Sequence, residues 1–194
     1  MLSIRKGQPW IFWPSSICDT FPINPANKLL TGDYTFTIDM DITLLDDSPK
    51  QKSIFCLLPC YTGLDVHSDF MVLTVSYKRK TEHYTLPVML ETEEKTNIRF
   101  NHIKGNGIYL YINDILVLSE NLNGHELGVD SSPHIIFGAG NFPRNNFNLN
   151  YTDFDMHKFY VYHEDQLVAK HDFKKYIFDK SVDLTDNCNF IHKI

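Results

Sequence analysis

Eleven consecutive residues, from Tyr34 to Leu44, alternate strictly between apolar and polar side chains. Successive side chains of an extended chain point to opposite faces of a sheet, so this pattern predicts a strand with one buried and one wet face. Helical periodicity is almost absent from the chain, with at most one turn expected in "HEDQLVAK" or "LNGHELG". The residues on the predicted buried face are Tyr34, Phe36, Ile38, Met40, Ile42 and Leu44.

Two further alternating segments, 96–103 and 107–118, are predicted to be strands paired in a hairpin. "KGNG" joins the two segments, and glycine and asparagine tolerate the positive φ of a tight turn. The residues expected to face the core are Ile98, Phe100, Ile108, Leu110 and Ile112. The outer face then collects Arg99, Asn101, Tyr109 and Tyr111. This set suits a ligand surface, and it is also ordinary strand composition, because tyrosine is favoured in strands.

Further short strands are predicted along the chain, and turn residues separate nearly all of them. Such spacing indicates an antiparallel sandwich, and 194 residues are enough for one substantial core. We predict a single domain over 1–194, with an N-terminal edge segment at 1–27 and the main body at 28–192. The additional predicted strands are 53–58, 70–77, 84–90, 134–138, 154–162 and 167–173.

Charge and composition exclude several function classes. The net charge of −6 disfavours nucleic-acid binding, which needs a positive field to neutralise phosphates. No stretch approaches the eighteen or more apolar residues of a membrane span. The N-terminus shows no secretory signal, so we expect synthesis in the cytoplasm, for a virion or as part of a longer exported protein. The four cysteines are expected to be free thiols rather than a disulfide framework or a metal site.

Four segments carry a resemblance to a known fold. "LTGDYTFTIDMDI" is similar to an opening strand, "TNIRFNHIKGNGIYLYIND" to a central hairpin, "FDMHKFYVYHEDQL" to a closing strand and "VDLTDNCNFIHKI" to a terminal segment. Together they resemble the concanavalin A-like jelly roll, and within it the laminin-G-like lectin and glucanase modules. Asp114 stands where those modules usually have a turn glycine. The resemblance implies an all-β, two-sheet antiparallel jelly-roll sandwich.

Catalysis is not expected. Glucanases of this fold carry Glu-x-Asp-x-Glu on one strand, and the nearest match here is Asp153, Asp155 and His157. A glycosidase needs one carboxylate to attack and one carboxylic acid to protonate the leaving group, and this row lacks that pair. A polar outer face of a sandwich strand explains it better.

No cofactor is predicted, and calcium is the one metal considered. "GLDVHSD" offers Asp65 and Asp69, and sandwiches of this kind often bind calcium with loop carboxylates and carbonyls. Calcium requires six to eight converging oxygens, of which these carboxylates supply only a part, so calcium is kept as an alternative to the absence of a cofactor.

The long segment 138–153 provides the remaining candidate ligand contacts, Asn141, Arg144 and Asn145. Long loops on rigid sandwiches often carry function, although these asparagines also suit a loop that satisfies its own turns. Sugars are recognised by aromatic ring faces and by amide or guanidinium groups, and both are plentiful. The sequence therefore predicts a non-catalytic carbohydrate-binding, lectin-like module that contacts a glycan. The alternative is a structural or adhesion component of a phage particle or cell-surface complex, which uses the same face for protein contacts.

Overall fold

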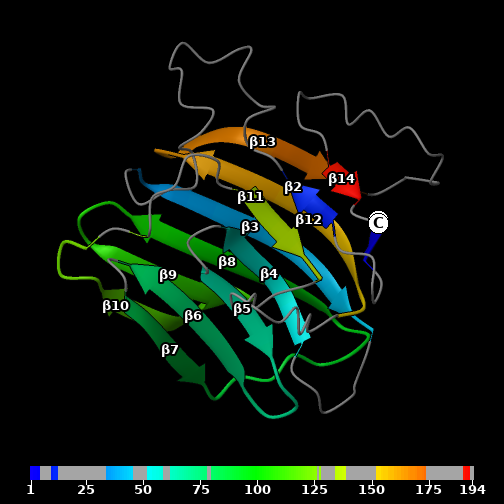
Figure 1. Cartoon of the computed structure of the whole chain (residues 1–194). Helices are drawn as coiled ribbons and strands as arrows, with labels where there is room; N and C mark the ends of the chain where they lie inside the picture. Colours follow the sequence, from blue (N-terminus) through cyan, green and yellow to red (C-terminus); the bar gives the residue numbers. More distant parts are fainter. Residues whose placement is uncertain are drawn as a thin grey trace.

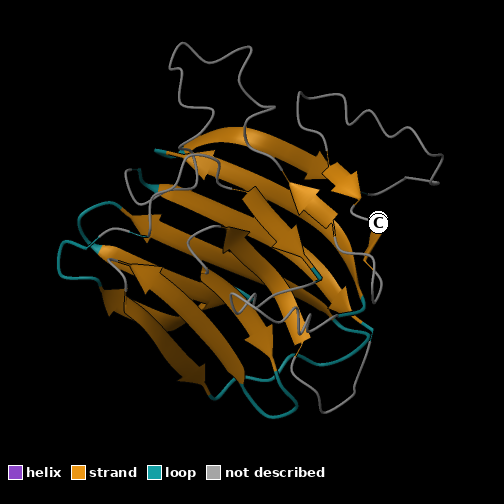
Figure 2. Ribbon diagram, viewed as in Figure 1, coloured by secondary structure: helices purple, strands orange, loops and turns teal. Residues whose placement is uncertain are grey.

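The computed structural model describes residues 1–4, 10–12, 34–45, 52–58, 62–77, 80–125, 127, 134–138, 152–173 and 190–192. These residues form strands and loops, and none of them is helical (Figure 2). The strands are β1 (Leu2–Ile4), β2 (Trp10–Phe12), β3 (Phe36–Leu44), β4 (Lys52–Leu58), β5 (Thr62–Val66), β6 (Met71–Tyr77), β7 (Lys80–Leu86), β8 (Lys95–Ile103), β9 (Gly107–Ile112), β10 (Ile115–Asn121), β11 (His134–Phe137), β12 (Phe154–His163), β13 (Gln166–Asp172) and β14 (Phe190–His192).

The strands form two antiparallel sheets that pack face to face (Figure 1). The first sheet has the order β1-β12-β3-β8-β9-β10, and β13 also pairs with β12. The second sheet has the order β14-β2-β11-β4-β5-β6-β7. The predicted all-β sandwich is confirmed. β1 and β2 enter different sheets, with β1 at an edge and β2 between β14 and β11.

The buried faces of the two sheets form one continuous core. Every inward residue predicted on the 34–44 and 96–112 strands is buried, apart from the half-buried Tyr34 at the start of β3. Phe100 lies at the centre, with its ring centroid 6.1 Å from that of Phe36 in its own sheet and 6.0 Å from that of Phe55 in the other. This aromatic contact therefore joins the two sheets.

Two tight turns connect the strands β8, β9 and β10. Gly107 opens β9, where a Cβ atom would lie 1.9 Å from the backbone oxygen of Glu120, so only glycine fits there. Asn113 and Asp114 form the turn between β9 and β10 with φ values of 49° and 64°. Two successive positive φ values match the right-handed twist of a hairpin. The predicted strand 107–118 is thus two strands joined by this turn.

Three further sequence predictions differ from the structure. β5 was not predicted because all five of its residues are buried, so it shows no alternation. β7 ends at Leu86, immediately before Pro87, whereas the prediction ran through this proline. "HEDQLVAK" forms no helical turn, since Glu164 and Asp165 have positive φ and reverse the chain between β12 and β13.

We expect the Phe100→Ala variant to lose about 3–5 kcal/mol of unfolding free energy, because it removes a buried ring that contacts both sheets. Urea denaturation of the two proteins measures the difference. Thr85→Ala, on an exposed position of β7, is the control and should change stability by less than about 0.5 kcal/mol. Equal losses in the two variants would contradict the assignment of the core.

Candidate functional site

The outer face of the first sheet gathers the polar side chains that alternate with the core residues. On β3 these are half-buried residues, while the residues between them are buried. Cross-strand pairing sets Asp39 opposite Arg99 and Asp41 opposite Asn97 on β8, and sets Tyr160 and Lys158 of β12 opposite the same two aspartates. Three adjacent strands therefore contribute to one surface.

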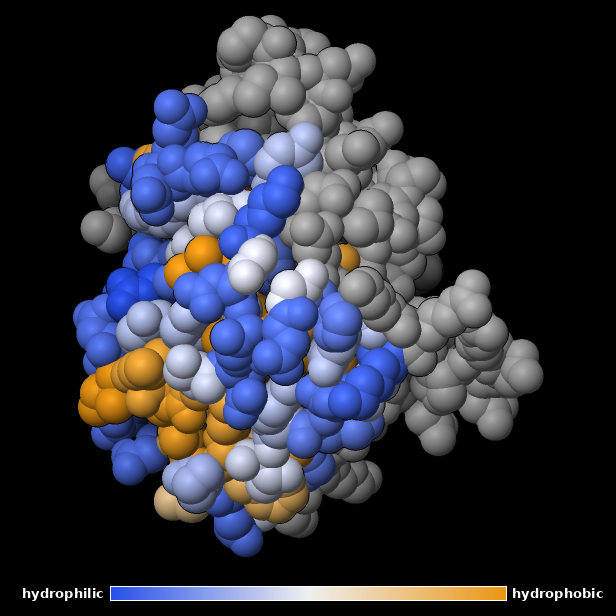
Figure 3. All heavy atoms as spheres, turned by 90° about the vertical axis from the view of Figure 1, so that its left-hand side faces the viewer, coloured by the Kyte–Doolittle hydropathy of each residue, from blue (hydrophilic) through white to orange (hydrophobic). Residues whose placement is uncertain are grey.

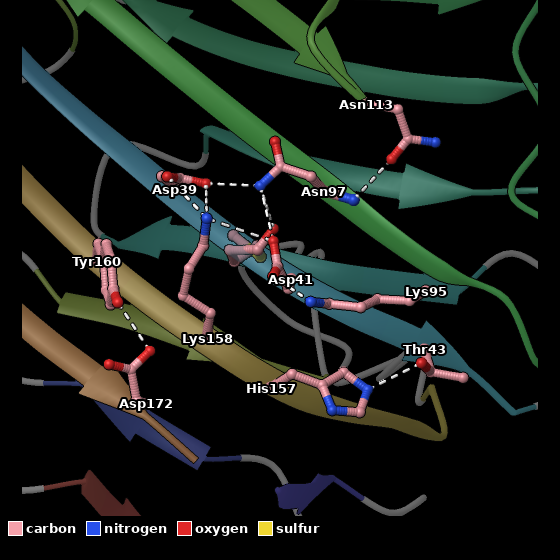
Figure 4. Close-up of polar contacts among 11 residues, drawn as sticks. Asp39, Asp41, Thr43, Lys95, Asn97, Asn113, His157, Lys158, Tyr160 and Asp172 are labelled. Atoms are coloured by element: carbon pink, nitrogen blue, oxygen red, sulfur yellow. Dashed lines mark hydrogen bonds and ion pairs between the residues drawn. The ribbon is translucent and has the colours of Figure 1, made fainter. Parts of the chain in front are cut away.

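A network of polar contacts, which we call the polar ladder, joins Asp39, Asp41, Lys95, Asn97 and Lys158 (Figure 4). The Asn97 Nδ2 amide donates to Asp39 Oδ1 at 2.7 Å and to Asp41 Oδ1 at 2.8 Å. The Lys158 ammonium lies 2.9 Å from Asp39 Oδ1 and 3.3 Å from Asp41 Oδ1. Lys95 Nζ contacts Asp41 Oδ2 at 2.7 Å. Both carboxylates are thus held in place from the two neighbouring strands.

The contacts of the polar ladder fix the charges of its members. Burial alone would raise the pKa of the Asp41 carboxyl, but hydrogen bonds from Lys95 and Asn97 and the nearby Lys158 charge outweigh burial and lower that pKa. Burial alone would lower the pKa of Lys158, and its contacts with Asp39 and Asp41 raise it instead. Both shifts favour the charged forms of Asp41 and Lys158, and in the ladder two lysines face two carboxylates.

Beside the ladder lies the aromatic patch formed by Arg99, Asn101, Tyr109 and Tyr111. Arg99 is registered with Tyr111 and Asn101 with Tyr109, as the sequence predicted. All four residues are half-buried. The Arg99 guanidinium lies over the Tyr111 ring, 4.6 Å from its centroid, and Arg99 Nη1 lies 3.2 Å from Asp114 Oδ1. The structure brings these four predicted residues together on one exposed face.

A second aromatic pair on the same face was missed by the sequence analysis. Tyr160 and Tyr162 of β12 are half-buried, with ring centroids 6.5 Å apart. The Tyr160 hydroxyl donates to Asp172 Oδ1 at 2.7 Å. Burial together with this hydrogen bond raises the pKa of Tyr160 to about 12. Strict alternation from Phe154 would turn both rings inward, but a shift of register between Met156 and Lys158 moves the even-numbered residues that follow to the outer face.

The row of Asp153, Asp155 and His157 does not form a carboxylate pair open to a substrate. Asp155 is buried beside β1, where Ser3 Oγ donates to its Oδ1 at 3.0 Å. His157 lies at a shift of register in β12, and its Nε2 is 2.9 Å from Thr43 Oγ1. Burial and the charge of Lys95 lower the pKa of His157.

The remaining predicted residues divide between described and undescribed parts of the chain. Asn141, Arg144 and Asn145 lie outside the described residues. Asp65 is buried within β5, and Asp69 is exposed in the turn that follows. Within the described ranges no three His, Cys, Asp or Glu side chains gather as metal ligands, and calcium stays an untested alternative. No helix in the described part of the chain has the length and apolarity to span a bilayer.

Comparison with solved structures identifies the architecture. The binding domain of botulinum neurotoxin serotype D matches with a TM-score of 0.58 and 15% identity over 86% of this chain. A structure of the receptor binding domain of botulinum neurotoxin D matches with 0.58 and 14% over the same share. A heptameric SAP-like pentraxin from Limulus polyphemus matches with 0.50 and 15%, over 87% of this chain and 80% of its own. The chain has a concanavalin A-like fold.

These similarities show the concanavalin A-like sandwich fold alone, because identities near 15% do not show the activity. The chain spans 39% and 40% of the two neurotoxin domains. No family model matches the sequence, and no curated protein does. Function must therefore be argued from the site itself.

We expect Asp41→Asn to lower the unfolding free energy by about 1–2 kcal/mol at neutral pH, since it weakens charge-assisted contacts that are partly exposed. The folded pKa of Asp41 lies below its ordinary value of 3.8, so its contribution is full above that pH and is lost as the pH falls through the folded pKa. Urea denaturation from pH 7 downward should show the gap between the two proteins narrowing below about pH 4.

The control for this variant is Asp114→Asn, in a pair whose carboxylate is 79% exposed. Exposed pairs contribute little, and asparagine tolerates the positive φ of this turn, so we expect a change below about 0.5 kcal/mol. A gap for Asp41→Asn that stays constant at low pH would contradict the role given to its charge.

Proposed function

We propose that this protein is a non-catalytic carbohydrate-binding module whose outer sheet face contacts a glycan. The observation that carries the proposal is the aromatic patch, in which two half-exposed tyrosines lie beside an arginine and an amide in cross-strand register. Arg99 and Asn101 supply the polar groups, and Tyr109 and Tyr111 supply the rings.

The chemistry of the patch suits a sugar. The apolar C–H faces of a pyranose ring pack on an aromatic ring, and its hydroxyls take hydrogen bonds from planar amide and guanidinium groups. Because adjacent strands hold these groups in fixed register, little side-chain freedom is lost on binding, which favours affinity. Two of the structural neighbours are described as binding or receptor-binding domains, which supports recognition rather than catalysis.

The segment that contains Asn141, Arg144 and Asn145 is proposed as a further source of ligand contacts. It follows β11 and precedes β12, and its asparagines and arginine carry the same donor groups as the patch. Its part in binding rests on sequence alone.

We expect Tyr109→Ala and Tyr111→Ala each to reduce glycan capture strongly while the fold survives, because both rings lie on the outer face and the core residues between them stay in place. A glycan array beside a thermal melt measures both properties. Phe70→Ala is the control, since it removes a half-buried ring, stacked on His67, from the β5–β6 turn of the other sheet. Intact binding in both tyrosine variants, or loss of binding in the control, would contradict the proposal.

A second candidate function is a structural or adhesion component that contacts protein. The side of the molecule that carries β9 and β10 shows an apolar patch among hydrophilic residues (Figure 3). On β10, Ile115 is 68% exposed and Leu116 48%, and Leu116 is registered with Tyr111. β10 is also an edge strand of the first sheet, and an exposed apolar edge favours pairing with another chain.

If protein contact at β10 is the function, the chain should self-associate or bind an assembly partner through this edge. Light scattering of the purified protein, across a range of concentrations, should then give a mass above that of one chain. Leu116→Lys should return it to a single chain, because a charge on the edge opposes pairing, whereas Thr85→Lys on β7 should not. A single-chain mass at every concentration would remove self-association as support for this candidate.

A further inference from the structure

Tyr111 and Tyr160 lie at the two ends of a single cross-strand row. Tyr160 pairs with Asp39, Asp39 with Arg99, and Arg99 with Tyr111. The row crosses β12, β3, β8 and β9, so the two tyrosines are three strand spacings apart, or about 14 Å. That span is longer than one sugar ring and fits a short chain of sugars.

The cations along this row already face carboxylates. Arg99 is paired with Asp114, Lys158 with Asp39 and Asp41, and Lys95 with Asp41. Lys170, beside Tyr160, lies 3.8 Å from Asp172. Among the described residues of the row, the polar ladder and the partners just named, four cations contact four carboxylates.

This balance works against an acidic ligand. The side chains of Lys158, Asp39 and Asp41 are only 14–22% exposed, so their mutual attraction is poorly screened. A carboxylate on the ligand would be repelled by Asp39 and Asp41. Its attraction to Lys158 would be weak, because these two aspartates already neutralise that cation. A hydroxyl-bearing, uncharged ligand meets no such repulsion and still finds two tyrosine rings and polar groups between them.

From these observations we infer that the face takes an uncharged oligosaccharide, which reaches from Tyr111 across the polar ladder to Tyr160. This inference rests on the proposed function and adds the class of ligand and a contact residue, Tyr160, on β12. The contact at Tyr160 is made by its ring, because its hydroxyl is already donated to Asp172.

The test uses an array of uncharged glucans, mannans, galactans and xylans, from monosaccharide to hexasaccharide, beside sialylated and uronic-acid-containing chains. The intact protein should bind uncharged chains more tightly as they lengthen and should bind the acidic chains more weakly. Tyr160→Ala should weaken binding of the longest chain by about tenfold while leaving the shortest bound sugar unchanged. Tyr160→Phe keeps the ring and should bind as the original protein does.

The other outcomes distinguish failure of this inference from failure of the proposed function. Binding that depends on Tyr111 but not on Tyr160, or that does not increase with chain length, overturns the inference and leaves the proposed function standing. Tighter binding of acidic chains also overturns the inference alone. Absence of binding to every glycan overturns both. If Tyr160→Ala fails to fold in a thermal melt, the length series of the intact protein and Tyr160→Phe still decide the matter.

Discussion

Two carboxylates on the outer face of a central strand are the constraint around which the first sheet is organised. β3 lies between β8 and β12, and Asp39 and Asp41 sit only two positions apart on it. Partly buried like charges repel each other and are costly to desolvate. Asn97 from β8 and Lys158 from β12 offset this cost, because each contacts both carboxylates. The same contacts link three strands and balance the charges on their outer face.

The proposed binding face depends on this neutralised centre. Because the charges of the ladder residues neutralise one another, we assign recognition to the aromatic rings at the two ends of the row. Arg99 lies over the Tyr111 ring, and Lys158 and Lys170 lie over the Tyr160 ring. Such rings on paired strands are more rigid than rings on loops, and a rigid face selects ligands by shape. The fold itself does not decide the ligand, since the same sandwich supports unrelated activities.

The sequence predicted what depends on alternation. Phe36, Ile98 and Leu110 turned inward and Tyr109 and Tyr111 outward, because strand parity is a local property of consecutive residues. Strands without alternation were harder to predict from the sequence. β5 is buried throughout, and β7 is mostly polar because it lies at the edge of its sheet. The partnership of Lys158 with Asp39 joins residues 119 positions apart. No local pattern encodes such a pairing. Tyr160 was missed because the register shift in β12 reverses the alternation before it.

The placement of β1 and β2 has a consequence for the order in which this chain assembles. β1 pairs with β12, and β2 pairs with β11 and β14. These two strands therefore cannot pair until partners more than a hundred residues later in the chain have been synthesised. During synthesis the two strands of each hairpin, β6–β7 and β8–β9, are made one after the other, whereas β1 and β2 are made long before their partners. Contacts so distant in sequence slow folding, because a long loop must close before they form. Until β12 emerges, the edge of β3 that receives Lys158 stays open, and the two aspartates remain without one of their cations.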